Sequence, residues 1–142
     1  MERAVASSSS DVLDANYLTE YREITRVMEH YLAGGRAGNG DLMRPAFCPG
    51  ATIAGYCFGK EYLGSVESLF EWFDENGPSP NIVPWFAGIE ILGTIAVVNL
   101  EVSGWSGIRV GGGQHHTSDV FTLLKRRGHW QVTQKTWHWH ES

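Results

Sequence analysis

Cysteine, long apolar runs and excess positive charge are all scarce in this sequence. Among its 142 residues are two cysteines, Cys48 and Cys57, and the absence of CxxC spacing predicts no disulfide framework and a reduced, cytoplasmic setting. Apolar runs such as Ile95 to Val98 fall far short of the roughly 20 residues that cross a bilayer, so we expect a soluble protein without a membrane partner. The formal net charge is -5 and no basic stripe occurs, which argues against nucleic acid as a partner.

Nucleotide-binding glycine motifs are also missing. The run "GGG" at 111–113 lies between predicted strands and has neither a lysine nor a helix after it. We therefore interpret this run as a loop and expect no Rossmann or P-loop nucleotide site.

What remains is the composition of one compact domain. Hydrophobic residues make up 42% of the chain, enough for a core. The first sixteen residues, with the serine run Ser7 to Ser10, predict a flexible tail, and residues 17–142 predict a single domain.

The hydrophobic spacing predicts helices followed mostly by strands. Apolar residues three and four apart predict a helix from Tyr17 to Ala33 that ends at Gly34 and Gly35, while Asp41 and Ser65 are candidate N-caps of two further helices. Alternating and β-branched segments predict strands at 52–58, 60–63, 84–104 (two strands), 115–125 and 129–140. This segregation of helices and strands indicates an α+β fold, with helices packed on one face of a curved sheet.

Three stretches, "HYLAGG...GD", "AF.PGA.I.GY" and "SDVFTLLKRRGHWQV", occur in that order of elements. Together they resemble the NTF2-like superfamily, which includes ketosteroid isomerase and SnoaL-like proteins, and most of all its branch labelled "putative lumazine-binding". The resemblance covers about residues 17 to 140. It implies a cone in which a strongly curved antiparallel sheet, with helices on its concave face, encloses an apolar pocket for an aromatic or polycyclic small molecule. It implies no single reaction, because this fold hosts both enzymes and carriers.

The same resemblance suggests two candidate catalytic residues. Tyr31 and Asp119 match by position the two hydrogen-bond donors that hold the oxyanion in ketosteroid isomerases. A carboxyl group in an apolar cavity has a raised pKa and can donate a hydrogen bond beside a tyrosine hydroxyl. The proton-moving aspartate of those enzymes has no counterpart, since its position matches Gly55, so we do not expect steroid isomerisation.

Histidine is the candidate substitute for the missing base, since its pKa of about 6.5 suits proton transfer near neutral pH. The last predicted strand reads "HWQVTQKTWHWH", and Trp130 and Val132 alternate as core-facing residues. Continued alternation places His138 inward and Trp137 and Trp139 outward.

The pairing register of this strand decides which of its side chains face the pocket, and the sequence leaves that register open. A two-residue turn at Arg127-Gly128 pairs Asp119 with Thr136 and supports an inward His138. A three-residue loop with a glycine bulge shifts the pairing by one and places Trp137 on the Asp119 face. The agreement with Trp130 and Val132 favours the first option.

Ligand-binding candidates and metal sites complete the sequence predictions. The expected pocket residues are Trp72, Phe86, Trp105, Phe121 and His116. His115, His116, His138 and His140 could approach one another across neighbouring strands. We nevertheless expect no metal and no other cofactor, because these histidines lie at the open ends of strands and the relatives of this fold usually need no metal.

The resulting functional prediction is a cofactor-independent small-molecule enzyme of the isomerase or dehydratase type. Asp119 and Tyr31 would hold an oxygen and His138 would move a proton. The alternative is a non-catalytic binding protein for an aromatic or heterocyclic small molecule. Outward Trp137 and Trp139 would form an exposed apolar strip, which predicts a homodimer through the outer face of the sheet.

Overall fold

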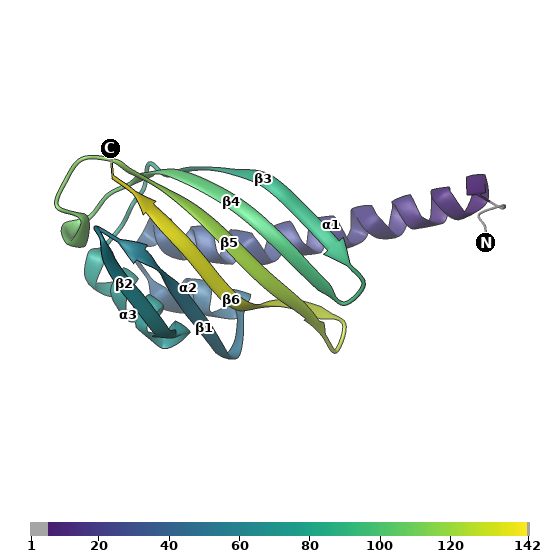
Figure 1. Cartoon of the computed structure of the whole chain (residues 1–142), viewed down its shortest axis with the longest axis horizontal. Coiled ribbons are helices and arrows are strands. Elements are labelled where there is room, and N and C mark those ends of the chain that lie inside the picture. Colours follow the sequence, from purple (N-terminus) through teal and green to yellow (C-terminus); the bar gives the residue numbers. More distant parts are fainter. Residues whose placement is uncertain (1–5, 142) are drawn as a thin grey trace.

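The computed structural model describes residues 6–141, and their side chains from residue 16 onward. Helix α1 (Ala6–Ala37) begins well before the predicted start at Tyr17, so all of the predicted tail that is described is helical. No glycine or proline interrupts the chain between Ala6 and Gly34, and nothing in the backbone stops the helix there. Residues 1–5 of the predicted tail lie outside the described residues. Figure 1 shows the first turns of α1 projecting past the sheet.

The expected order of elements is confirmed. After α1 come α2 (Gly40–Met43), a 3₁₀ turn (Arg44–Ala46), β1 (Phe47–Cys57), β2 (Lys60–Ser65), α3 (Val66–Asn76), β3 (Val83–Leu92), β4 (Ile95–Trp105), a second 3₁₀ turn (Ile108–Val110), β5 (His115–Arg126) and β6 (His129–His140). The Ser65 hydroxyl caps α3 by accepting a hydrogen bond from the Glu67 amide at 3.1 Å. None of the helices in residues 6–141 has the length and apolarity needed to span a membrane.

The strands form one mixed sheet in the order β2-β1-β6-β5-β4-β3. The prediction of an antiparallel sheet is wrong for one pair, because β1 and β6 run parallel. Short turns impose antiparallel pairing on consecutive strands, whereas β1 and β6 are far apart in the chain and no turn sets their direction. The three α-helices of the described part of the chain lie on one face of this sheet (Figure 1).

The core lies between the helices and the inner face of the sheet. Helix α1 buries Ile24, Met28, Tyr31 and Leu32, at the spacing that predicted an amphipathic helix. The sequence predicted that Gly34 and Gly35 end this helix, and that prediction is wrong, because the helix continues to Ala37. A Cβ atom on Gly35 would lie 2.8 Å from the indole of Trp105, so glycine is needed here for close packing.

The register between β5 and β6 changes part-way along the hairpin. The two-residue turn forms as predicted, with positive φ at Arg127 and Gly128, and Arg126 pairs with His129. The pairing then jumps from Leu123 opposite Val132 to Thr122 opposite Gln134, which leaves Thr133 as the extra residue of a β-bulge.

This bulge reverses the faces of the second half of β6. Asp119 pairs with Trp137, and the buried side chains of the strand after the bulge are Lys135 and Trp139. The prediction that His138 faces inward is therefore wrong. The prediction that Trp137 and Trp139 face outward is wrong for the same reason. The physical reason is that one inserted residue moves every later side chain to the other face.

Candidate active site

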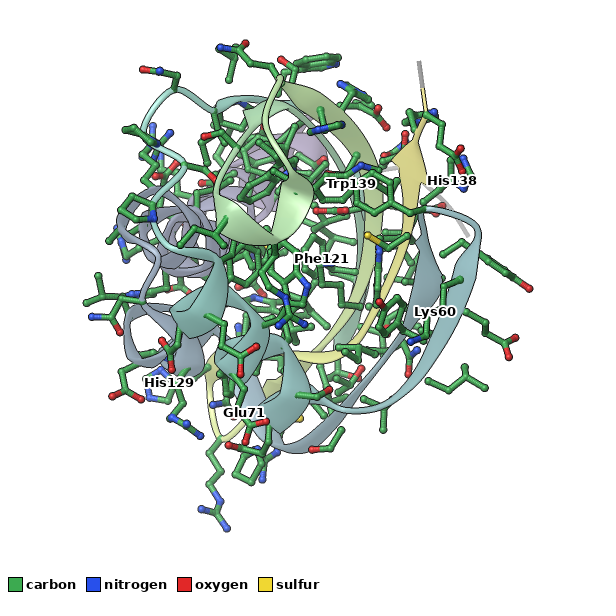
Figure 2. All side chains as sticks on the ribbon, turned by 90° about the vertical axis from the view of Figure 1, so that its left-hand side faces the viewer. Lys60, Glu71, Phe121, His129, His138 and Trp139 are labelled. Atoms are coloured by element: carbon green, nitrogen blue, oxygen red, sulfur yellow. The ribbon has the colours of Figure 1, made fainter. Side chains whose placement is uncertain are left out.

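A cavity of about 240 Å³ lies between the helices and the inner face of β1 and β6. Aromatic side chains make up seven of its sixteen lining residues. They are Tyr31, Tyr62, Trp72, Phe73, Trp105, Trp137 and Trp139. Figure 2 shows Trp139 on the inner side of β6 and His138 on its outer side. This lining suits a flat or aromatic small molecule.

One lysine lies among these aromatic groups. Lys135 lines the cavity, and the residue is only 4% exposed. Its Nζ lies 4.2 Å from the ring centre of Trp137 and 3.9 Å from Oδ1 of Asp119. Burial lowers the pKa of the Lys135 ammonium, and the Asp119 charge opposes that shift only in part. Lys135 therefore has a larger fraction of neutral amine near pH 7 than a surface lysine.

Asp119 and Tyr31, the two candidates taken from the family resemblance, do meet. The Tyr31 hydroxyl donates to Oδ2 of Asp119 at 3.1 Å, and both side chains are buried. Burial raises the pKa of the Asp119 carboxyl, and Lys135, Tyr31 and Thr117 offset this shift only in part. Burial and the Asp119 charge also raise the pKa of Tyr31, so its hydroxyl keeps its proton.

The second oxygen of the Asp119 carboxyl, Oδ1, accepts no hydrogen bond and lies behind the cavity wall, 3.9 Å from the Lys135 ammonium. Within residues 16–141, the buried atoms without a hydrogen-bond partner are Oδ1 of Asp119, Nε1 of Trp139 and Oδ1 of Asn99. Of these three residues, Trp139 lines the cavity. A buried polar group without a partner is costly, so a ligand with an acceptor for the Trp139 Nε1 hydrogen would gain from binding here.

The network continues along the cavity wall through Thr117 to Trp105. Its indole Nε1 donates to the Thr117 hydroxyl at 2.8 Å, and Thr117 interacts in turn with the Asp119 carboxyl. This bond holds Trp105 in the cavity wall above Gly35. The indole thus has both a packing and a hydrogen-bonding reason for its orientation.

Of the other sequence candidates, some line the cavity and some do not. Trp72 and Trp105 line it. Phe121 is fully buried and packs edge-on against Tyr31, with 5.2 Å between ring centres, and it is not a lining residue. Phe86 packs against the core from β3, away from the cavity. These positions separate binding candidates from core residues.

His138 and His116 are both outside the cavity. His138 is exposed on the outer face of β6, and His116 contacts Glu101 on the outer face of β5. Sequence reasoning missed Lys135 and Trp139 as lining residues, and it gave Trp137 only as an alternative. The alternative register, shifted by one residue, correctly placed Trp137 beside Asp119, although the bulge lies within the strand rather than at the turn.

The space of the missing base is occupied by Trp137. Gly55 pairs with Trp137 across the parallel strands, and a Cβ atom on Gly55 would overlap the indole and the carbonyl oxygen of Trp137. An aspartate could not replace this glycine without displacing the indole.

We expect Gly55→Ala to lower the free energy of unfolding by about 1–3 kcal/mol, because the added methyl group overpacks this contact. Urea denaturation measures the effect. Gly64→Ala is the matched control, since nothing lies within 4 Å of its Cβ position, and it should stay within about 0.5 kcal/mol of the parent. Equal stability of the two variants would contradict the close contact at Gly55.

Comparison with known proteins agrees with this architecture. The model of a family described as "Putative lumazine-binding" matches residues 19–138. The chain belongs to this family. An NTF2-like protein of unknown function from Shewanella baltica is 35% identical, with a TM-score of 0.79 over 89% of this chain and 98% of that one. This similarity shows that the fold is NTF2-like.

Two more distant proteins of the comparison carry functional names. A ketosteroid isomerase-like protein from Erwinia carotovora atroseptica has a TM-score of 0.68 at 14% identity, over 85% of this chain and 96% of that one, which shows a shared fold. The aldolase FrzH of Cladobotryum sp is 24% identical over 120 residues, covering 84% of this chain and 91% of the relative. This chain thus has a distant relative that is an aldolase.

Proposed function

We propose that this protein is a cofactor-independent enzyme, of the lyase or isomerase class, that acts on a small carbonyl compound through the amine of Lys135. The observation that carries the proposal is a buried lysine in the wall of an aromatic cavity, 3.9 Å from a buried carboxyl group. A lysine desolvated in an apolar pocket is the group that forms Schiff bases with carbonyl substrates. The aldolase among the distant relatives supports carbon–carbon bond chemistry.

The first step would join the substrate to the enzyme. The lone pair of the neutral Lys135 amine attacks the carbonyl carbon, and the π electrons move to the oxygen, which takes a proton. Loss of this oxygen as water leaves a protonated imine on Nζ. Asp119 is placed to give and take these protons, because its pKa is raised and its Oδ1 is the carboxyl oxygen nearest to Nζ.

The iminium ion would then accept the electron pair of a bond to the neighbouring carbon. When the bond to a hydroxyl-bearing carbon breaks, the Asp119 carboxylate takes the hydroxyl proton, a carbonyl product leaves and an enamine remains. When a carbon–hydrogen bond breaks, Asp119 takes that proton and the enamine forms directly. Protonation of the enamine and addition of water to the iminium return the free amine. Tyr31 acts as a positioning residue in this scheme, because its hydroxyl is bound to Asp119.

The lining of the cavity indicates the substrate class. Trp72, Trp137 and Trp139 offer apolar ring faces, and the Trp139 Nε1 hydrogen lacks a partner among the described residues. A substrate with an aromatic or flat body and an oxygen acceptor would match both features. The curved, cone-shaped enclosure implied by the family resemblance is part of this proposal.

Reductive trapping tests the proposed function. We expect a small aromatic aldehyde or ketone, with sodium cyanoborohydride, to add one reduced adduct to the native protein, on the peptide that contains Lys135. Lowered amine pKa and aromatic packing should favour this lysine over the exposed Lys60. Peptide mass spectrometry reads the position. Adducts confined to surface lysines, or none at all, would contradict the proposal.

The second candidate function is binding without turnover. The aromatic lining that favours it also suits a heterocycle, and the family description names lumazine. In that case a bound compound would be recovered unchanged and Lys135→Met would still bind it. A homodimer through the outer face of the sheet stays a prediction, which Trp137 and Trp139 no longer support because neither faces outward.

A further inference from the structure

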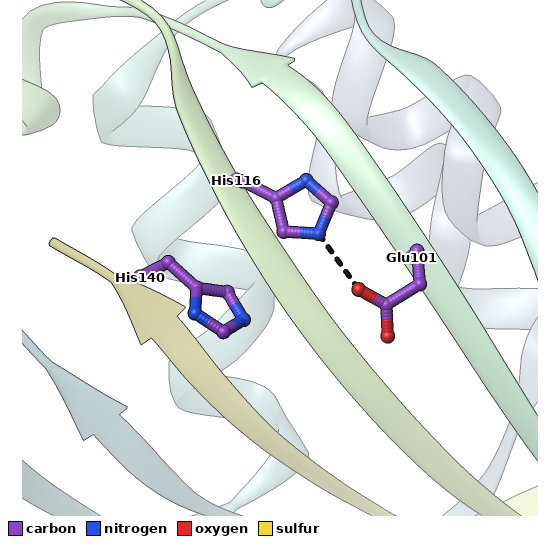
Figure 3. Close-up of side chains that lie close together, drawn as sticks. All are labelled: Glu101, His116 and His140. Carbon is purple, nitrogen blue, oxygen red and sulfur yellow. Dashed lines mark hydrogen bonds and ion pairs between the residues drawn. The ribbon is translucent and has the colours of Figure 1, made fainter. Parts of the chain in front are cut away.

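A second cluster of chemically active side chains lies on the face of the sheet opposite the cavity. Glu101 from β4, His116 from β5 and His140 from β6 each offer a ligand atom, and these atoms all lie within 4.8 Å of one another. Figure 3 shows the three side chains gathered over neighbouring strands. Nothing in the proposed reaction uses them.

We propose that Glu101, His116 and His140 bind a zinc ion. Two imidazole nitrogens and one carboxylate oxygen form a set that suits Zn²⁺ and related divalent transition metals, whereas Mg²⁺ and Ca²⁺ prefer oxygen ligands throughout. Three protein ligands leave a fourth position of the tetrahedron for water. The site is independent of Lys135, and its presence or absence does not bear on the proposed reaction.

The strand register creates this arrangement. His116 pairs directly with His140, and Glu101 pairs with Ser118, so the ligands lie on three adjacent strands at nearly the same height. The bulge at Thr133 is required, because without it His140 would lie on the inner face. The same irregularity that brings Lys135 into the cavity thus assembles the outer cluster.

Hydrogen bonds already orient the three side chains. The His116 Nε2 atom lies 2.7 Å from Oε1 of Glu101, and the Ser118 hydroxyl donates to that oxygen at 2.8 Å. The same hydroxyl lies 2.8 Å from Nε2 of His140. Ser118 therefore links two ligands and is placed to keep its bond to the carboxylate when a metal is bound, as outer groups do in metal sites.

The spacing suits a metal after small side-chain rotations. Ligand atoms of a tetrahedral zinc site are separated by roughly 3.3 Å, given metal–ligand distances of about 2.0–2.1 Å. The His116 and Glu101 atoms must separate slightly and His140 must approach. All three residues are on the sheet's outer face and at least partly exposed, so the strands need not move.

Calorimetric titration of the full chain with Zn²⁺ tests this site. We expect one saturable equivalent, and at least a tenfold weaker affinity in His116→Ala and in His140→Ala. His129→Ala is the matched control, because this exposed histidine lies at the other end of β6 and should leave the affinity unchanged. Unchanged binding in both ligand variants, or the absence of a saturable equivalent, would overturn the proposal.

Cobalt substitution gives a measurement that does not depend on the variants. Co²⁺ added to the parent protein should give the visible absorption bands of a four-coordinate ion with nitrogen and oxygen ligands, and an equivalent of Zn²⁺ should remove them. A spectrum like that of hexa-aquo Co²⁺ would contradict the site even if His116→Ala or His140→Ala failed to fold.

Discussion

Lys135→Met is expected to abolish adduct formation with carbonyl compounds and to lower any carbonyl turnover by at least about a thousandfold, as loss of a covalent nucleophile does. Methionine preserves the length and apolar stem of the side chain but has no amine. The cavity and its aromatic wall should therefore stay intact. Reductive trapping and the rate of product formation are the measurements.

Lys125→Met provides the control for this variant. Lys125 lies on the neighbouring strand β5 and pairs with Glu20 at 2.8 Å, outside the cavity. We expect it to retain the adduct and the full rate. If Lys135→Met kept its activity with an unchanged fold, the amine would have no role, and acid–base catalysis by Asp119 alone or simple binding would replace the proposal.

The sequence predicted those parts of the fold that depend on local pattern. The apolar spacing along α1, the serine cap of α3 and the Arg127-Gly128 turn each have a nearby physical cause, and each forms. The parallel pairing of β1 with β6 could not be read in the same way. It depends on two strands that are distant in the chain, and neither strand's residues specify the direction of the other.

The candidate site was only half predictable, and the bulge at Thr133 explains the division. Tyr31 lies on α1, outside the hairpin, and Asp119 lies on β5, before the bulge in the chain. These two residues meet as the family resemblance implied. Lys135 follows it. Strict alternation from Trp130 assigned Lys135 to solvent and His138 to the pocket, and a single extra residue reversed both. The residues around Thr133 carry no glycine or proline that would have indicated a bulge.

The buried pair of Asp119 and Lys135 also makes a large prediction about stability. Each single replacement, Asp119→Asn or Lys135→Met, leaves an ionisable group buried without its partner, and breaking such a pair costs about 3–5 kcal/mol when the remaining group stays charged. The double variant removes both charges, while asparagine can still accept the Tyr31 hydrogen bond. We expect the double variant to lose about 1–3 kcal/mol less than the sum of the two single losses.

The pH dependence of the two single variants should run in opposite directions. In Lys135→Met, loss of the cation further raises the pKa of Asp119, so the folded state favours the protonated acid and stability falls as pH rises above about 4. In Asp119→Asn, loss of the anion further lowers the pKa of Lys135, so stability falls as pH drops below about 10. Urea denaturation across this range distinguishes them, with the double variant as a control that should show neither slope. Parallel pH curves for the two single variants would show that the folded protein does not shift the pKa values of Asp119 and Lys135 in opposite directions, and the roles proposed for a neutral Lys135 amine and a protonated Asp119 would lose their basis.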